Sequence, residues 1–337
     1  MNLIHLTHEQ RQYLAFEFKR ELREDADFIT DYEKKDLEVL IEVLEQPNTS
    51  IKTIKTYPLV QDKSILITGA SQGSIGYNCA EYMQTNGWKV YTTVRRQEEY
   101  DVHLEKGWLP QIMDYCDSDS IEKVVNFVAD NNNGKLGALF NNGGYCQYGY
   151  TEDIPVEALK EQYEANVLGW IELTEKILPV MKNQGYGRII MHGSILGNIP
   201  LNYRGAYNST KSFIKVLTNN YRNSYTDIGF SLIETGPVRS KIRANSIKYF
   251  RKYINENESR FRDTYLTQID QFLNNPNQVN PFTEQPISVA MRLLDAVESE
   301  TPRARYMISM PTYTFECYKQ TLTLDQCLSM SWLDSTD

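Results

Sequence analysis

The sequence lacks any apolar run long enough to cross a membrane, because no stretch approaches the roughly 18 to 20 uninterrupted apolar residues that a spanning helix needs. Its first residues lack the basic start, apolar stretch and small-residue cleavage site of a secretory signal. A surplus of positive charge is missing too, since the net charge is −9, which argues against nucleic acid as the main partner. We therefore expect a cytoplasmic protein with no membrane span that acts on a small molecule.

Residues that could hold a metal or form disulfides are few and scattered. The five cysteines form no closely spaced pair and their number is odd, and the four histidines form no ligand motif. This usage indicates reduced thiols rather than a disulfide framework or a zinc site. We expect no metal.

Three segments differ in character along the 337 residues. Residues 1–60 carry two capping-box signatures, each ahead of an amphipathic helical pattern, and are interpreted as a two-helix N-terminal extension. Its apolar stripes need cover from the main domain or from another subunit. Residues 61–312 are predicted to form the main domain, and residues 313–337 a helical tail.

A glycine-rich turn opens the main domain. Residues 63–68 are a short, apolar, β-rich run, and glycines follow at positions 69, 73 and 76 as a helical pattern begins. Such glycines between a strand and a helix let the backbone approach a pyrophosphate, toward which the helix N-terminus points its N–H groups. The turn therefore predicts a dinucleotide-binding site.

The next predicted strand, residues 88–94, ends in Arg95 and Arg96. An NAD site needs an acidic side chain here for the ribose hydroxyls, and Val94 and its neighbours offer none. A guanidinium suits a 2′-phosphate through bidentate hydrogen bonds. The pattern favours NADP(H) over NAD(H), and the alternative is a solvated arginine pair at a strand end.

Strand and helix patterns alternate through the rest of the main domain, and a long helical stretch over residues 156–184 is interrupted around Asn166. The alternation predicts right-handed βαβ units and a Rossmann-type, doubly wound parallel sheet in three α/β/α layers. Ligands of such sheets lie beyond the carboxyl ends of the strands. Asp114, the glycine- and asparagine-rich residues 141–144 and Ser194 all fall at predicted strand ends.

A long excursion over residues 239–281 follows the strand predicted at residues 230–234. It is polar in background but rich in aromatic side chains. Its place in the chain predicts a mobile helical lid over the cofactor site. The aromatic surface suggests a sizeable apolar substrate, and the alternative is that these rings pack against the lid's own helices.

Tyr207 and Lys211 carry the strongest chemical signal. They lie four residues apart in a predicted helix, so both side chains leave the same face, and Ser194 precedes Tyr207 by thirteen residues. A nearby ammonium lowers the pKa of a phenol, so we expect Tyr207 to act as a general acid or base. The alternative is an ordinary structural pair on a solvated helix face.

Together these residues resemble the classical short-chain dehydrogenase/reductases. The resemblance covers roughly residues 62–310 and rests on the TGASQGSIG turn at 68–76, NNGG at 141–144, Asn166, Ser194, Tyr207, Lys211 and TGPVRS at 235–240. The arginine after the second strand and the long lid are similar to NADP-preferring members that act on retinoids, hydroxysteroids and other apolar alcohols or carbonyls.

The resemblance implies a role for each matching residue. Tyr207 would donate the proton in carbonyl reduction, Lys211 would hold the nicotinamide ribose, Ser194 would bind the substrate oxygen, and Asn166 would keep a helix kink and a water. Cofactor contacts would come from Gly69, Ser71, Gly73 and Ile75 at the pyrophosphate and adenosine, Arg95 at the 2′-phosphate, Asp114 at the adenine, Asn141 and Gly143 at the adenosine ribose side, and Val238 and Ser240 at the carboxamide.

Two positions inside the matched region depart from the family's pattern. Gly143 replaces the usual alanine, which should loosen the strand end, and Thr235 replaces the usual proline, which restores a backbone N–H. The resemblance also implies a homodimer or homotetramer that pairs through the helices at 156–184 and 206–225.

Two other functions stay open from the residues. One is an NADP-binding redox sensor that presents its N-terminal helices to a partner. The other is a non-redox epimerase or dehydratase on the same scaffold.

Overall fold

The structure, a computed structural model, describes residues 55–269, 273 and 282–321, together with Ala15, Phe18, Lys19, Glu38 and Ile41. Most of the predicted two-helix extension, the end of the predicted lid and most of the predicted tail lie outside the described residues. Nothing in the described part tests the proposed domain boundaries, which stay predictions.

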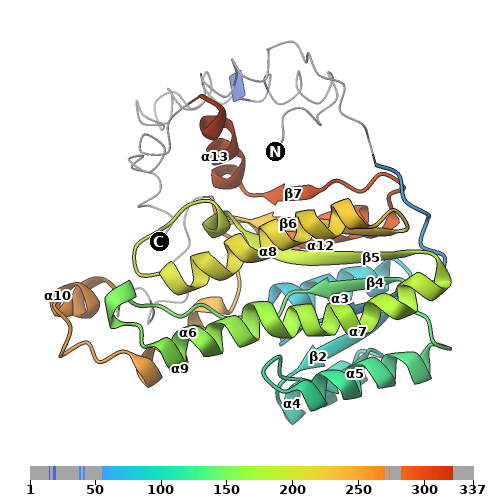
Figure 1. The fold of residues 1–337 in the computed structure, drawn as a ribbon, viewed down its shortest axis with the longest axis horizontal. Helices are drawn as coiled ribbons and strands as arrows, with labels where there is room; N and C mark the ends of the chain where they lie inside the picture. Colours follow the sequence, from blue (N-terminus) through green and yellow to red (C-terminus); the bar gives the residue numbers. More distant parts are fainter. Residues whose placement is uncertain are drawn as a thin grey trace.

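A seven-stranded parallel sheet forms the centre of the protein (Figure 1), in the order β3-β2-β1-β4-β5-β6-β7. The order reverses between β1 and β4, which is the topological switch point where ligands of such sheets bind. The strands are β1 (Ser64–Ile67), β2 (Lys89–Val94), β3 (Leu109–Ile112), β4 (Ala138–Asn141), β5 (Gly187–Ser194), β6 (Ile228–Thr235) and β7 (Arg305–Ile308).

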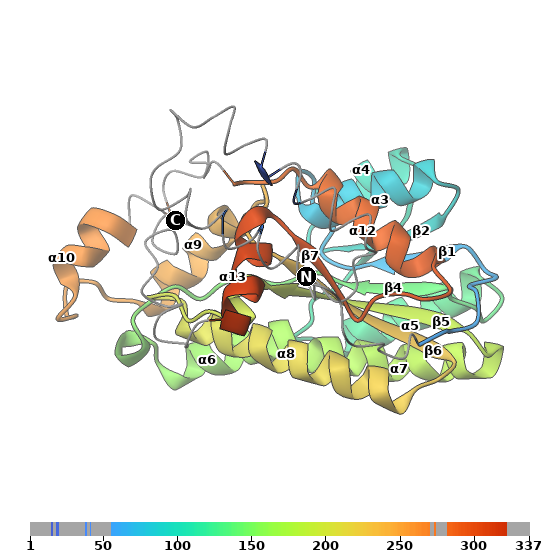
Figure 2. The ribbon, with the colours of Figure 1, turned by 90° about the horizontal axis from the view of Figure 1, so that it is seen from above.

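Helices cover both faces of the sheet (Figure 2), so the strands are buried on both sides and read as continuous apolar runs. One face carries α3 (Ile75–Thr85), α4 (Gln97–Glu105) and α12 (Ile287–Glu298). The other carries α5 (Ser118–Asn131), α7 (Gly169–Gln184) and α8 (Gly205–Ser224). Two buried apolar clusters, one for each face, form the core. The predicted Rossmann-type three-layer fold is confirmed.

Several of the segments that follow the strands lie beyond the carboxyl ends of the strands. There α6 (Val156–Tyr163) precedes a π-helical turn (Glu164–Leu168), and α9 (Ile242–Tyr253), α10 (Arg262–Thr264) and a second π-helical turn (Tyr265–Ile269) form the described part of the predicted lid. Short 3₁₀ turns occupy Thr151–Asp153 and Ile195–Gly197, and α13 (Met310–Thr321) follows β7.

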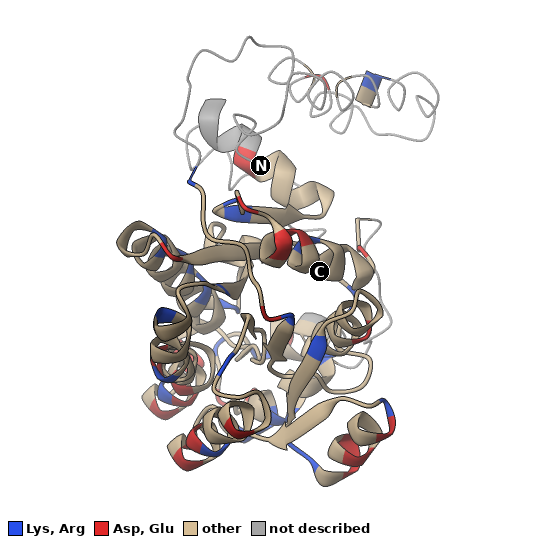
Figure 3. Cartoon of the chain, turned by 90° about the vertical axis from the view of Figure 1, so that its right-hand side faces the viewer, with Lys and Arg blue, Asp and Glu red and all other residues tan. Residues whose placement is uncertain are grey.

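Acidic and basic residues are interspersed over the helices of the described part (Figure 3). No described helix is both long enough and apolar enough to traverse a bilayer.

Candidate active site

The glycine-rich turn connects β1 to α3 and has backbone geometry that favours glycine. Gly69 and Gly73 have φ of 63° and 75°, in the left-handed region. A Cβ on Gly69 would lie 2.4 Å from the Cα of Gly143, so the turn touches the segment after β4 backbone to backbone. Ser74 caps α3 by accepting a hydrogen bond from a backbone N–H of its first turn at 3.1 Å. The helix N-terminus at Ile75 therefore faces the turn, as a pyrophosphate site requires.

A buried hydroxyl network holds this turn against β4. The Tyr115 hydroxyl hydrogen-bonds Thr68 Oγ1 at 2.7 Å and Asn141 Oδ1 at 2.9 Å. Asn141 is fully buried, and its Nδ2 donates to Thr174 Oγ1 at 3.0 Å. The Asn141 side chain thus serves the core, which leaves only its main chain to face a cofactor.

Tyr115 also explains the glycine at position 143. A Cβ on Gly143 would lie 3.2 Å from Tyr115 Cε2 and 3.3 Å from the Cα of Gly69. The aromatic ring and the turn occupy the space of the missing methyl, so this strand end is well packed rather than loosened. Sequence reasoning missed Tyr115 because nothing in the sequence shows which way its ring points.

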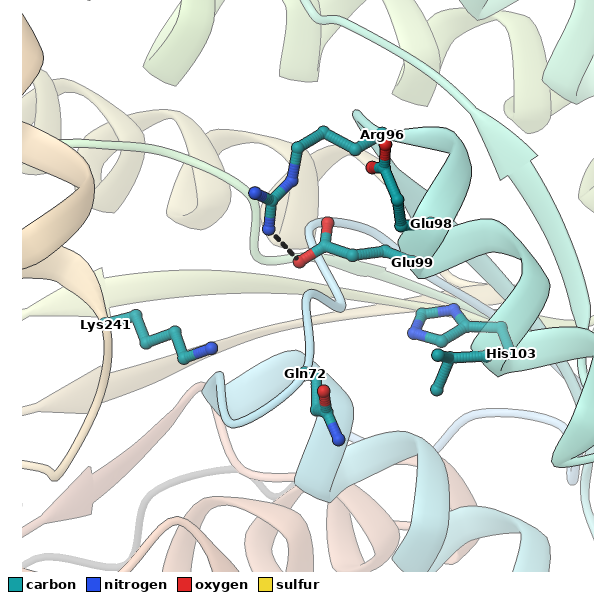
Figure 4. A pocket seen from close by; sticks show the side chains of 7 residues that line it. Gln72, Arg96, Glu98, Glu99, His103 and Lys241 are labelled. Carbon is teal, nitrogen blue, oxygen red and sulfur yellow. Dashed lines mark hydrogen bonds and ion pairs between the residues drawn. The ribbon is translucent and has the colours of Figure 1, made fainter.

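Arg95 and Arg96 point to different partners. Arg95 Nη1 donates to Tyr249 Oη at 3.1 Å, whereas Arg96 Nη2 donates to Glu99 Oε1 at 2.8 Å (Figure 4). Glu99 Oε2 also accepts a hydrogen bond from Ser71 Oγ at 3.0 Å. Arg96 and Glu99 line a pocket of about 390 Å³ between the glycine-rich turn and α4, together with Gln72, Glu98, Val102, His103 and Lys241.

The remaining predicted cofactor residues also lie beyond the carboxyl ends of the strands. Asp114 follows β3, and its Oδ1 accepts a hydrogen bond from a backbone N–H two residues on at 3.0 Å. Val238 forms an isolated parallel bridge with Glu284 after β6. Ser240 Oγ accepts the first backbone N–H of α9 at 3.4 Å. These three positions therefore ring the same strand ends as the glycine-rich turn.

Ser194, Tyr207 and Lys211 come together at the carboxyl end of β5. Ser194 ends β5, Tyr207 and Lys211 lie one turn apart on α8, and all three are buried. Lys211 Nζ lies 5.5 Å from the centre of the Tyr207 ring and 4.6 Å from that of Trp170, and it donates to the backbone oxygen of His192 at 2.7 Å. The three side chains thus share one desolvated site.

The prediction that Lys211 lowers the pKa of Tyr207 is wrong, because the pKa of Tyr207 is raised. Burial raises the pKa of Tyr207, the nearby Cys146 thiol raises it further, and the hydrogen bond with Ser194 opposes them. Burial also lowers the pKa of Lys211 to about 7, against the opposing effect of Cys146. A partly neutral lysine cannot stabilise a phenolate strongly, so desolvation outweighs the attraction between the two groups. Tyr207 therefore keeps its proton at neutral pH.

The predicted interruption at Asn166 is the π-helical turn between α6 and α7. Asn166 is fully buried, accepts the backbone N–H of Tyr145 at 3.2 Å and donates to the backbone oxygen of Tyr145 at 2.9 Å. Its Nδ2 also lies 3.4 Å from Thr210 Oγ1, beside Lys211. Asn166 therefore ties the segment after β4 to α8 at Thr210.

The described part of the predicted lid packs over Tyr207. The Tyr249 ring of α9 stacks on Tyr145, with ring centres 3.5 Å apart and planes 11° apart. Phe250 packs against Tyr265 with ring centres 5.7 Å apart, so the lid's aromatic residues contact one another as well. One buried apolar cluster contains Tyr207 together with Cys146, Tyr148, Phe250, Ile254, Tyr265 and Ile269.

Comparison with known proteins decides the family. The model of the short chain dehydrogenase family matches residues 63–249, more than half of the chain. The chain belongs to the short-chain dehydrogenase family. It is therefore an oxidoreductase that acts on alcohol or carbonyl groups with a nicotinamide cofactor.

Relatives of this dehydrogenase include an uncharacterized oxidoreductase, YbbO, of Escherichia coli K12, 29% identical over 78% of this chain and 91% of the relative. The NADPH-dependent 1-acyldihydroxyacetone phosphate reductase of Schizosaccharomyces pombe is 29% identical over 59% of this chain and 72% of the relative. A solved short-chain dehydrogenase of Burkholderia phymatum in complex with NAD covers 78% of this chain and 92% of its own, with 19% identity and a TM-score of 0.62.

Glu99 lines the pocket beside the glycine-rich turn and was not among the predicted residues. It lies five residues after the end of β2, in the first turn of α4. The acidic pair Glu98 and Glu99, separated from the arginines by one residue, was the available signal.

Proposed function

We propose that the protein is an NADP(H)-dependent oxidoreductase that interconverts a carbonyl and an alcohol on a sizeable apolar substrate, with Tyr207 as the proton donor and acceptor. The observation that carries this proposal is the joint burial of Ser194, Tyr207 and Lys211 at the carboxyl end of β5, next to the glycine-rich turn.

The residues beside that turn fit a nicotinamide dinucleotide. The left-handed glycines and the N-terminus of α3 offer backbone N–H groups to a pyrophosphate. Arg96 and Lys241 line the pocket beside it, which supports a site for a 2′-phosphate. When bound, such a cofactor supplies or accepts the hydride.

The chain's own residues supply the proton and bind the developing charge. Ser194 and Tyr207 would meet a substrate carbonyl oxygen with two hydroxyl donors, which stabilises the negative charge that grows there. Burial raises the pKa of Tyr207, so the phenol holds the proton that reduction consumes.

The lid supports an apolar substrate. Aromatic and aliphatic side chains of α9 and of residues 265–269 share a buried cluster with Tyr207. The fission-yeast relative is named for an acyl-bearing ketone, which agrees with this surface. Long-chain aldehydes and ketones are therefore the first substrates to test.

The same chain is proposed to pair through α7 and α8. Phe213 and Val216 lie three residues apart on α8 and are 44% and 60% exposed, and Leu168 before α7 is 47% exposed. A cluster of exposed apolar side chains is typical of an interface. A homodimer or homotetramer would cover them. The redox-sensor alternative rests on N-terminal helices outside the described residues, and no described contact favours it.

The test is NADPH consumption by the purified full chain with a panel of aldehydes and ketones of increasing chain length. We expect turnover that improves with chain length and falls by at least about a thousandfold in Tyr207→Phe, because the proton donor is lost. Tyr221→Phe on the same helix is the matched control and should keep wild-type turnover. NADPH binding without oxidation by any member of the panel, or full activity in Tyr207→Phe, would contradict the proposal.

A further inference from the structure

The pocket beside the glycine-rich turn places an acidic side chain where the adenosine ribose of a dinucleotide is held. In doubly wound folds, the residue after the second strand contacts the ribose 2′ position. Here Arg96, two residues after β2, lines a pocket with Gln72 of the turn and Glu99 of the first turn of α4 (Figure 4). The inference below rests on the proposed use of a nicotinamide dinucleotide.

Glu99 is fixed in this pocket. Its residue is 7% exposed, one carboxylate oxygen accepts from Ser71 Oγ at 3.0 Å, and the other accepts from Arg96 Nη2 at 2.8 Å. It lies in the first turn of α4, where the helix dipole favours a negative charge. Two side chains suited to a 2′-phosphate, Ser71 and Arg96, are therefore already hydrogen-bonded to a carboxylate.

The charges that line the pocket balance. Arg96 and Lys241 are positive, Glu98 and Glu99 are negative, and burial lowers the pKa of His103, which keeps it neutral. Lys241 lies over the turn, since a Cβ on Gly73 would approach its Cε to 3.1 Å. A doubly charged phosphate beside Glu99 would be repelled, whereas a 2′-hydroxyl would find a hydrogen-bond acceptor there.

We propose that Glu99 is a cofactor-discriminating residue that limits the preference for NADPH and lets the site accept NADH as well. Its carboxylate accepts a hydrogen bond from the ribose 2′-hydroxyl of NADH. The same carboxylate competes with the 2′-phosphate of NADPH for Arg96 and Ser71. Specificity here is a difference between two affinities, set by one attractive and one repulsive contact.

The experiment measures equilibrium dissociation constants of NADPH and NADH for the full chain by the fluorescence of the bound dinucleotide. Glu99→Gln keeps an oxygen for Ser71 and removes the charge. We expect NADPH to bind about tenfold more tightly and NADH about threefold more weakly in Glu99→Gln, because a repulsion and a charge-assisted hydrogen bond are both lost.

Two further variants separate the position of the charge from its presence. Glu98→Gln removes the same charge from the same pocket without a contact to Ser71, and its affinity ratio should stay within about threefold of wild type. Glu99→Asp keeps a negative charge, and its ratio of NADPH to NADH affinity should also stay within about threefold of wild type. A thermal midpoint for each variant shows that the fold is kept.

An unchanged ratio in Glu99→Gln, or an equal shift in Glu98→Gln or Glu99→Asp, would overturn the role of Glu99 while leaving the proposed function intact. A wild-type chain that binds NADPH at least a hundredfold more tightly than NADH would also overturn it. Binding of neither dinucleotide by the wild-type chain would overturn the proposed function and this inference together.

Discussion

Acid should weaken this protein through a histidine that bridges the sheet and the glycine-rich turn. His192 of β5 lies 2.7 Å by its Nδ1 from Asn142 Oδ1 and 3.2 Å by its Nε2 from Thr235 Oγ1. Asn142 in turn donates to the backbone oxygen of Thr68 at 2.9 Å. Because Asn142 Oδ1 only accepts, Nδ1 carries the proton and Nε2 accepts from the threonine.

The size of the effect follows from the pKa. Burial, and the neighbouring Lys211 charge, lower the pKa of His192 from 6.5 to about 3. Between these two pH values the unfolded chain binds the proton and the folded chain does not, so the free energy of unfolding falls as the pH drops through this window. From about pH 8 to about pH 5 this single group should cost the fold about 2 kcal/mol.

The assay is urea unfolding of wild type and His192→Asn at several pH values from about 8 to about 5. The asparagine offers polar atoms without a titrating ring, so the stability difference between the two proteins should shrink by about 2 kcal/mol on acidification. His103, whose pKa burial also lowers, is present in both proteins and cancels in the difference. Parallel stability curves over this range would refute the reasoning.

Three further predictions concern stability and assembly. Gly69→Ala should cost at least about 2 kcal/mol more in urea unfolding than Gly87→Ala, because both have positive φ but only the first Cβ meets backbone, at 2.4 Å, while the second meets nothing within 4 Å. Tyr115→Phe should cost about 1–3 kcal/mol in the same assay, since two buried oxygens lose a hydrogen-bond partner. Val216→Glu should shift the chain toward monomer in light scattering with little change in thermal midpoint, and an unchanged mass would contradict a place for Val216 in the interface.

The architecture was predictable because it depends on patterns that repeat along the chain. Buried parallel strands read as short apolar runs, helices read as amphipathic stretches, and their alternation predicts an α/β fold with a parallel sheet. The same topology brings the glycine-rich turn, Ser194 and the helix carrying Tyr207 and Lys211 to one edge. A helix interruption at Asn166 was also predictable, although its π-helical form was not.

Side-chain direction was not predictable. Two adjacent arginines look equivalent in the sequence, yet Arg95 bonds Tyr249 of the lid and Arg96 bonds Glu99 in the pocket. Neighbouring residues at a strand end point to opposite sides of the sheet. Only the three-dimensional position of α4 and α9 therefore decides which arginine faces the pocket beside the glycine-rich turn. The place of Tyr115 was unpredictable for the same reason, because its hydroxyl contacts Thr68 at the start of the glycine-rich turn.

The direction of the Tyr207 pKa shows why spacing alone misjudges electrostatics. A tyrosine and a lysine four residues apart on a helix suggest that the ammonium lowers the pKa of the phenol. That argument includes the charge of the lysine but leaves out the burial of both groups. In the structure both groups are desolvated, and burial penalises the charged form of each. The phenol therefore keeps its proton while the lysine loses part of its charge near neutral pH. Burial therefore decides the direction of both pKa shifts, which the helical spacing of the two residues does not give.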